Sequence, residues 1–253
     1  MRNIKLIIAF DGTGYFGWQR QKSELTIQGI IEDAIAKMTC APVTLHGAGR
    51  TDTGVHAEGM VANFTTDSSI SITGFQHGLN SILPDSVRIM SVVEADRNFH
   101  ARFSAKGKEY EYHFAAMEIL SPLERLYVVR VAPAIDLKAM RECLALLAGE
   151  HDFSSFEATG SRDLSVTGGR GAIRTISHAE LVELTGKPGR FKVVLAGDGF
   201  LRHMVRNIVG TLFEVGKGRI SPTDFQEIMT AKNRARAGAT APANGLLLKK
   251  VFY

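Results

Sequence analysis

The chain has 253 residues, of which 45% are apolar, and a formal net charge of +4. This length can bury a large core and allows one or two domains, while the mild basic excess fits a polyanionic partner without requiring one. The two cysteines, Cys40 and Cys143, form no metal-binding or disulfide pattern, so a reducing cytoplasm is expected. No apolar run is long enough for a signal peptide or a membrane span.

The first 95 residues alternate between strand and helix patterns. Strands are expected at 3–10, 43–46, 61–64 and 87–93, and helices at 27–38, after Thr26 as N-cap, and at 75–83, before Pro84. This β-α-β-β-α-β order is that of a ferredoxin-like unit, in which two helices cover one face of a four-stranded antiparallel sheet. The other face of such a sheet remains open.

The remainder of the chain repeats roughly the same order. Strands are expected at 106–114, 128–131, 172–184, 191–196 and 246–252, and helices at 137–147, from about 200 to 216, and from Ser221 onward. The sequence therefore predicts an α+β fold of two similar halves, residues 1–105 and 106–253, whose sheets could merge into one.

The loop from Gly47 to Ala57 has the composition of a site. Its glycines permit close backbone approach, and Arg50 and Asp52, two apart, leave the same face of an extended segment. An aspartate among threonines and glycines is more often a turn former. However, this loop lies between two expected strands, where catalytic residues concentrate. Both interpretations stay open at this point.

Several kinds of chemistry lack their usual residues. The eight histidines form no His-Glu-x-x-His motif and no pair spaced by three or four, so metal-dependent hydrolysis is not expected. No nucleophile elbow and no dinucleotide fingerprint occur, so no redox cofactor is expected.

A carboxylate with arginines and an aromatic strand remain. Arg202 and Arg206, one turn apart on the expected long helix, either face solvent or carry a cation to a carboxylate on a neighbouring loop. Tyr110, Tyr112 and Phe114 alternate onto one strand face, where Tyr110 could stack on a base. At least one of the three is expected to pack inside the sheet.

Several blocks together resemble the tRNA pseudouridine synthase A family. They span nearly the whole chain in family order: 10–13, 17–21, 47–57 (Gly-Ala-Gly-Arg-Thr-Asp-Thr-Gly-Val-His-Ala), 99–103, 108–110, 199–207 (Gly-Phe-Leu-Arg-His-Met-Val-Arg-Asn) and 245–246. The resemblance implies two ferredoxin-like halves around a continuous mixed, mostly antiparallel sheet, with helices on one side and an active-site cleft on the other. It also implies a homodimer that binds the anticodon stem-loop of tRNA and isomerises uridines 38, 39 and 40 without cofactor or metal.

Residue roles follow from the resemblance at matching positions. Asp52 is the expected nucleophile, Arg206 its ion-pair partner, and Tyr110 the ring that stacks on the target uracil, while Arg50 helps to fix the flipped nucleotide. Leu246 is expected to contact substrate, and the residues expected to contact RNA are Arg20, Lys22, Arg162 and Arg202. For Arg162 the basis is an irregular loop rich in glycine, serine and threonine, which could equally be a solvated surface loop. Two positions depart from the family pattern, Thr53 in place of Ala and Leu247 in place of Tyr.

Two other functions compete. A non-catalytic ferredoxin-like RNA-binding module would use Tyr110 and Tyr112 but leaves Asp52 without a purpose. An Asp-dependent nuclease lacks the carboxylates that would hold two metals. The sequence does not choose among attack of the aspartate at C1′, attack at C6, or a glycal route.

Overall fold

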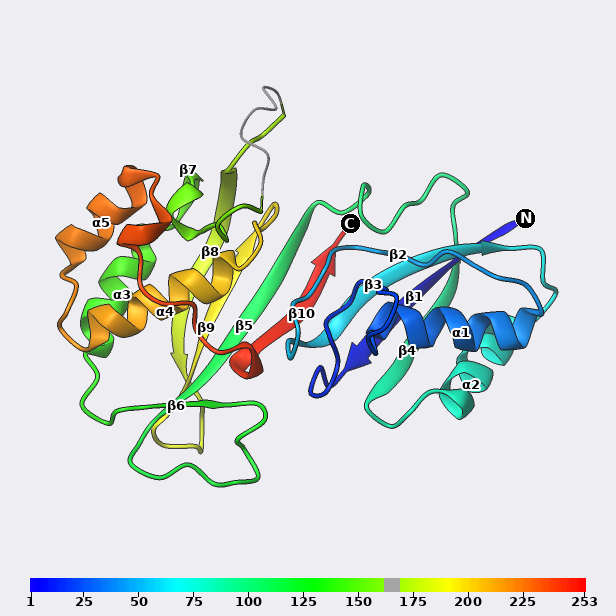
Figure 1. Cartoon of the computed structure of the whole chain (residues 1–253), viewed down its shortest axis with the longest axis horizontal. Helices are drawn as coiled ribbons and strands as arrows, with labels where there is room; N and C mark the ends of the chain where they lie inside the picture. Colours follow the sequence, from blue (N-terminus) through cyan, green and yellow to red (C-terminus); the bar gives the residue numbers. More distant parts are fainter. Residues whose placement is uncertain (162–168) are drawn as a thin grey trace. The chain divides into compact units, whose positions relative to one another are not determined.

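The computed structural model describes residues 1–161 and 169–253. These residues form two compact units, one of residues 1–106 with 247–253 and one of residues 107–246 (Figure 1). Five α-helices and mostly antiparallel strands make up the described residues, which confirms the expected α+β class. Within the same ranges, no helix combines the length and apolar character that crossing a membrane requires.

Unit 1 is built on three antiparallel strands. Its elements are β1 (Arg2–Phe10), α1 (Ile27–Thr39), β2 (His46–Gly47), β3 (His56–Thr66), α2 (Ile72–Ile82), β4 (Val87–Ala95) and, from the end of the chain, β10 (Leu246–Phe252). Strand β1 lies between β3 and β4 and pairs antiparallel with both. Strand β3 also pairs antiparallel with β2 and parallel with β10. The last strand of the chain is therefore part of the first unit.

Of the two helices of unit 1, α1 begins where the sequence predicts, whereas α2 begins at Ile72, three residues before the expected start. Thr26 caps α1 and Ser71 caps α2, each side chain accepting a hydrogen bond from the backbone N–H three residues later. The helices approach each other at Gly78, where a Cβ atom would lie 2.3 Å from the terminal methyl carbon of Met38. A glycine on α2 thus permits the close packing of α1 and α2 seen in Figure 1.

The strand expected at 43–46 is shorter than predicted, because β2 contains only His46 and Gly47. The backbone of Leu45 is bonded to side chains of α1 instead. Its N–H donates to Glu32 Oε1 at 2.9 Å, and its carbonyl accepts from Gln28 Nε2 at 3.1 Å. Since these two groups are satisfied by a helix, they do not join a strand ladder.

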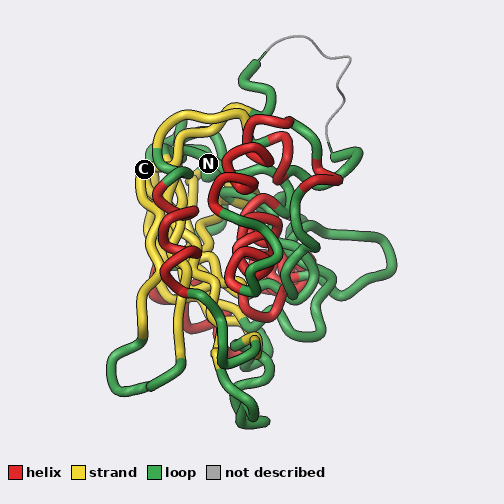
Figure 2. Tube along the Cα trace, turned by 90° about the vertical axis from the view of Figure 1, so that its left-hand side faces the viewer, coloured by secondary structure: helices red, strands yellow, loops and turns green. Residues whose placement is uncertain are grey.

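Unit 2 has an antiparallel sheet in the order β5-β9-β8-β7, with β6 parallel to β5. Its elements are β5 (Gly107–Ala116), β6 (Val129–Val131), α3 (Leu137–Ala145), β7 (Gly149–Asp152), the 3₁₀ turn η1 (Ser154–Phe156), β8 (Ile173–Glu183), β9 (Arg190–Gly197), α4 (Met204–Gly216), α5 (Pro222–Ala231), η2 (Arg234–Arg236) and η3 (Ala243–Gly245). Strand β7 was not expected from the sequence. The loops around these elements are green in Figure 2.

Aromatic rings join α4 to the sheet of unit 2. Tyr112 and Phe114 on β5 are fully buried, and the ring of Phe213 on α4 lies edge-on to both, with centroid distances of 6.0 and 5.3 Å. Such edge-to-face pairs are favourable beyond the area that they bury. The expectation that at least one of the three aromatic residues of this strand packs inside the sheet is confirmed.

Helix α4 begins later than the sequence predicts. His203, the residue before Met204, has φ of 61°, in the left-handed region that stops a helix from extending toward its N-terminus. Just before it, the carbonyl of Arg202 accepts a hydrogen bond at 2.9 Å from the N–H of Ala158. The prediction that Arg202 and Arg206 lie one turn apart on the same helix is therefore wrong, because Arg202 precedes α4.

Candidate active site

Asp52 occupies the first position of a tight turn in unit 1. Its carbonyl accepts a hydrogen bond at 3.1 Å from the N–H of Val55, and Gly54, at the third position, has φ of 77°. A positive φ at that position is the signature of a type II turn, which favours glycine. The main chain closes this turn, and the half-buried Asp52 is held at its corner.

Two glycines from the segment before α1 support the same loop. A Cβ atom on Gly12 would lie 2.1 Å from the carbonyl oxygen of Val55, and one on Gly17 would lie 2.5 Å from that of Thr51. The N–H of Trp18 donates to the same Thr51 oxygen at 3.1 Å. Backbone therefore packs directly on backbone on both sides of Asp52, closer than any side chain would allow.

Arg50 is tied to helix α1 through a chain of amide side chains. Its Nε donates to Gln19 Oε1 at 3.0 Å, and Gln19 Nε2 donates to Gln28 Oε1 at 2.9 Å. Gln28 in turn donates to the buried carboxylate of Glu32 at 2.9 Å. The exposed guanidinium of Arg50 is thereby linked, through the exposed Gln19, to the buried pair Gln28 and Glu32.

The other basic residues of unit 1 differ in their surroundings. Arg20 forms ion pairs with Glu32, at 2.9 Å, and with Asp33, both on α1. Its guanidinium thus connects the segment after Trp18 to that helix. Lys22 is exposed. Arg162 lies outside the described residues.

Tyr110, on β5 of unit 2, is 8% exposed, and its ring lies edge-on to Phe200 with a centroid distance of 5.0 Å. Tyr112, two residues along, is fully buried and donates its hydroxyl hydrogen to the carbonyl of Pro242 at 2.9 Å. Burial raises the pKa of Tyr112 well above its usual range, against the opposing effect of Arg206. The alternative in which Tyr110 and Tyr112 both stack on RNA is therefore wrong for Tyr112.

Arg206 lies in the first turn of α4, against residues 238–241. Its Nε donates to the carbonyl of Ala241 at 2.8 Å, and the N–H of Ala241 donates to the carbonyl of Arg206 at 3.0 Å. One turn later, a Cβ atom on Gly210 would lie 1.8 Å from the carbonyl oxygen of Ala239. Residues 238–241 therefore pack directly on α4, and the carbonyl of Ala241 fixes the Nε atom of Arg206.

A buried amide holds this segment in place. Asn207 is fully buried, and its Oδ1 accepts from Thr240 Oγ1 at 2.6 Å and from Arg234 Nη2 at 3.0 Å. Its Nδ2 donates to the carbonyl of Phe156 at 2.8 Å. Neither Arg234 nor Thr240 was expected from the sequence. The available signal was an asparagine within the apolar stripe of a helix, where a buried polar side chain requires partners.

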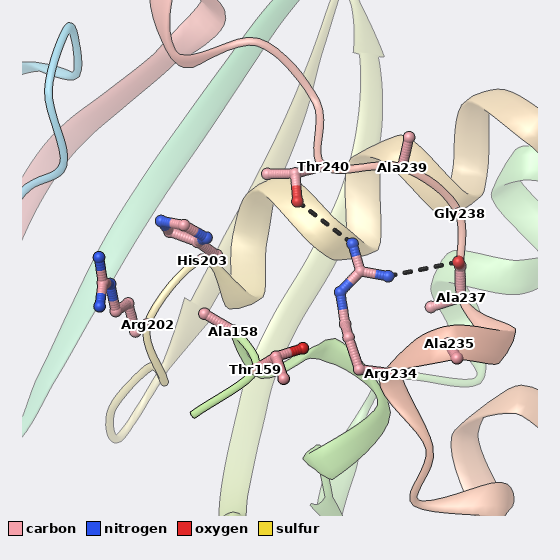
Figure 3. A pocket seen from close by; sticks show the side chains of 10 residues that line it. All are labelled: Ala158, Thr159, Arg202, His203, Arg234, Ala235, Ala237, Gly238, Ala239 and Thr240. Carbon is pink, nitrogen blue, oxygen red and sulfur yellow. Dashed lines mark hydrogen bonds between the residues drawn. The ribbon is translucent and has the colours of Figure 1, made fainter. Parts of the chain in front are cut away.

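A cavity of about 450 Å³ opens beside this network in unit 2. Arg202 and His203 stand on one side of it and Arg234 on the other (Figure 3). The structure thus brings Arg202 to the same cavity as an arginine that the sequence did not indicate. Leu246, the first residue of β10, is buried.

The expected site residues are divided between the two units. Arg50 and Asp52 share one loop of unit 1, whereas Tyr110 and Arg206 belong to unit 2. Leu246, although it begins β10, is the last residue of unit 2, and the rest of that strand belongs to unit 1. In unit 1, backbone contacts with Gly12 and Gly17 hold the loop of Asp52. In unit 2, hydrogen bonds with Ala241 hold Arg206.

Comparison with known proteins identifies the family. A family model described as tRNA pseudouridine synthase matches residues 6–104 and 144–253, which include Asp52, Arg206 and most of the chain. The chain belongs to the tRNA pseudouridine synthase family. The family and the isomerase class expected from the sequence are thereby confirmed.

Full-length relatives carry the same family name. The chain is 51% identical to tRNA pseudouridine synthase A 1 of Desulfotalea psychrophila, 46% to tRNA pseudouridine synthase A of Acetivibrio thermocellus and 45% to that of Geobacter sulfurreducens. Each of these matches covers all of this chain and all of the relative.

Proposed function

We propose that this protein isomerises uridine to pseudouridine at positions 38, 39 and 40 of the tRNA anticodon arm, with Asp52 as the catalytic carboxylate and no cofactor. The observation that carries the proposal is the family match over residues 6–104 and 144–253, a range that includes the loop in which backbone contacts lie on both sides of Asp52. In this reaction the N1–C1′ bond breaks, the uracil rotates and a C5–C1′ bond forms; the C5 proton leaves to water and N1 takes up a proton from water, so that the product is an isomer of uridine.

An ionised carboxylate serves each of the routes that are open to the enzyme. It attacks C1′, attacks C6, or removes a sugar proton to give a glycal. A guanidinium within about 4 to 6 Å lowers a carboxylic acid pKa by roughly 1 to 3 units and so keeps the group ionised in a desolvated site. We assign this role to Arg206, whose Nε is already fixed by the carbonyl of Ala241.

The detached uracil must stay in the site while it rotates. We assign its retention to Tyr110, which stacks on the base while Phe200 supports the tyrosine ring edge-on. Base stacking on an aromatic ring contributes about 1 to 3 kcal/mol and tolerates a change in the orientation of the base. Arg50, oriented through Gln19, is assigned to the phosphate or ribose of the flipped nucleotide.

Tritium release from tRNA labelled at uridine C5 tests the proposal, with EDTA present. The wild-type protein is expected to release tritium, whereas Asp52→Ala and Asp52→Asn are expected to lose release by a factor of about 10³ or more and to keep their affinity for tRNA. Asp67→Asn is the matched control, because Asp67 is an exposed carboxylate of the same unit whose described partner is the N-terminal amine. Release by Asp52→Ala at the wild-type rate would refute the assignment.

Transcripts with a single uridine at position 38, 39 or 40 test which nucleotides are modified. A non-catalytic RNA-binding module would bind these transcripts without releasing tritium. The resemblance also implies a homodimer, and light scattering of the purified protein tests that part of the proposal.

A further inference from the structure

The cavity of unit 2 is lined by basic and neutral groups. Its walls come from the residues after η1, the residues before α4, and the segment from η2 to Thr240 (Figure 3). The lining residues are Ala158, Thr159, Arg202, His203, Arg234, Ala235, Ala237, Gly238, Ala239 and Thr240. None of these ten is acidic, so the electrostatic potential in the cavity favours an anion.

Arg234 reaches the cavity as a partly desolvated cation. Its guanidinium donates to three neutral oxygens, Ala237 O at 3.3 Å, Asn207 Oδ1 at 3.0 Å and Thr240 Oγ1 at 3.2 Å. No carboxylate of residues 1–161 or 169–253 pairs with it. Burial alone lowers the pKa of Arg234, although a guanidinium remains charged at neutral pH. A cation removed from water without a counter-ion is costly, and an anion in the cavity would offset that cost.

Arg202 supplies a second cation on the opposite side. Its backbone is fixed by the hydrogen bond from Ala158, while its side chain is exposed and pairs with no acid among the described residues. Next to it, His203 is the N-cap residue of α4, and its side chain accepts no capping hydrogen bond from the backbone N–H groups of the first turn. The positive end of that helix dipole therefore adds to the charge of the two arginines.

We propose that this cavity binds a backbone phosphate of the substrate RNA between Arg202 and Arg234. The inference rests on the proposed function, because that function makes RNA the ligand. Thr240 lines the cavity and directly precedes Ala241, whose carbonyl holds Arg206. A phosphate bound here anchors the RNA strand next to the arginine assigned to the catalytic carboxylate.

Salt-dependent binding gives the first test. Affinity for a fluorescently labelled tRNA transcript is measured against potassium chloride concentration for the wild type, Arg202→Gln and Arg234→Gln, with thermal unfolding used to check that each variant folds. Each substitution is expected to weaken binding several-fold at about 0.15 M salt and to reduce the salt slope by roughly one. Arg141→Gln is the matched control, since Arg141 is an exposed arginine on α3 away from the cavity.

Neutral methylphosphonate linkages give the second test, because Arg202→Gln leaves the Arg234 network intact. A series of RNAs carries one such linkage each, at successive positions of the anticodon arm. At one position the linkage is expected to weaken binding by the wild type. At that same position it is expected to have no further effect on binding by Arg202→Gln. Such non-additivity identifies the paired phosphate. If both arginine variants match Arg141→Gln, or if no linkage couples to Arg202, the proposal is overturned. If the cavity binds inorganic phosphate but no methylphosphonate linkage couples to Arg202, the cavity is only an anion site, and the proposal of an RNA phosphate is also overturned.

The two proposals fail separately. Wild-type protein that releases no tritium from tRNA refutes the proposed isomerisation, while the coupling between Arg202 and a phosphate still reports on RNA binding. Normal tritium release without any coupling refutes only the phosphate site.

Discussion

Arg206 and Ala241 exchange two hydrogen bonds, one from the arginine side chain to the alanine carbonyl and one between their main chains. Because Nε is fixed at 2.8 Å from that carbonyl, the plane of the guanidinium is set before any substrate arrives. The position of residue 241 depends in turn on Thr240, which is bonded to the buried Asn207.

Thr240→Val tests that dependence. The substitution keeps the shape of the side chain but removes the hydroxyl that donates to Asn207 and accepts from Arg234. We expect a loss of about 1 to 3 kcal/mol in the free energy of unfolding, and a roughly tenfold lower kcat. Thr240→Ser is expected to restore kcat, and Thr230→Val on the exposed face of α5 serves as the control. An unchanged kcat in folded Thr240→Val would show that Arg206 does not depend on this network.

Gly17→Ala tests the support of the Asp52 loop. Gly17 and Gly14 have similar φ values, 82° and 79°, so alanine at either position costs about 1 kcal/mol or more in backbone strain. Only at Gly17 would the new Cβ also meet the Thr51 carbonyl, at 2.5 Å, whereas at Gly14 nothing lies within 4 Å. Tritium release by Gly17→Ala is therefore expected to fall well below that of Gly14→Ala. Equal rates in the two variants would contradict this account of the loop.

Tyr110 is expected to act through its ring and not its hydroxyl. Tyr110→Phe keeps the aromatic ring and its edge-on contact with Phe200, so kcat/KM should stay within a few-fold of the wild type. Tyr110→Ala should lower kcat/KM by roughly 5- to 150-fold, the equivalent of about 1 to 3 kcal/mol of base stacking. Steady-state kinetics on tRNA measures both, with Tyr127→Ala as a control. A large loss in Tyr110→Phe would assign the role to the hydroxyl instead.

Glu111 gives a prediction for stability against pH. This buried carboxylate on β5 contacts His113 Nε2 at 3.0 Å and Lys192 Nζ at 2.7 Å. The hydrogen bond with His113, followed by that with Lys192, lowers the pKa of Glu111 to about 2. A carboxyl whose pKa is depressed on folding contributes stability above its unfolded pKa, about 4.5, and loses that contribution as pH falls toward 2.

Urea unfolding of Glu111→Gln from pH 7 to pH 2.5 measures this contribution. At pH 7 the variant is expected to be less stable than the wild type by up to roughly 3 kcal/mol, and the difference should shrink below about pH 4.5. Glu183→Gln, on the exposed part of β8, is the control. A stability difference that stays constant across this range would exclude titration of Glu111 as its cause.

Local patterns predicted most elements of the fold. The apolar spacing after Thr26 and the Ser-Pro start of α5 gave helices that the structure has, the second with a complete capping box between Ser221 and Asp224. The predicted bounds are wrong where contacts with residues distant in the sequence determine the local structure. The strand at 43–46 is shortened because Glu32 and Gln28 bond the backbone of Leu45, and no local pattern reports such a contact.

The candidate site was predictable to the extent that its residues lie in short motifs. Arg50 and Asp52 stand out because glycines flank them in one loop. Arg234 and Thr240 do not, since their importance comes from a network with Asn207 that joins three separate segments. The left-handed backbone of His203 could not be predicted from the sequence either, because histidine adopts this conformation only where the surroundings require it.

The pairing of β10 with β3 affects the order in which the protein can fold during synthesis. Leu247 and Leu248 lie beside His56 and Ala57, and the hydroxyl of Tyr253 reaches the carbonyl of Ala101. Residues 247–253 emerge from the ribosome after the whole of unit 2. The first unit to be translated is therefore the last that can be completed, and until then the part of the β3 edge at His56 and Ala57 stays open to incorrect pairing with other chains.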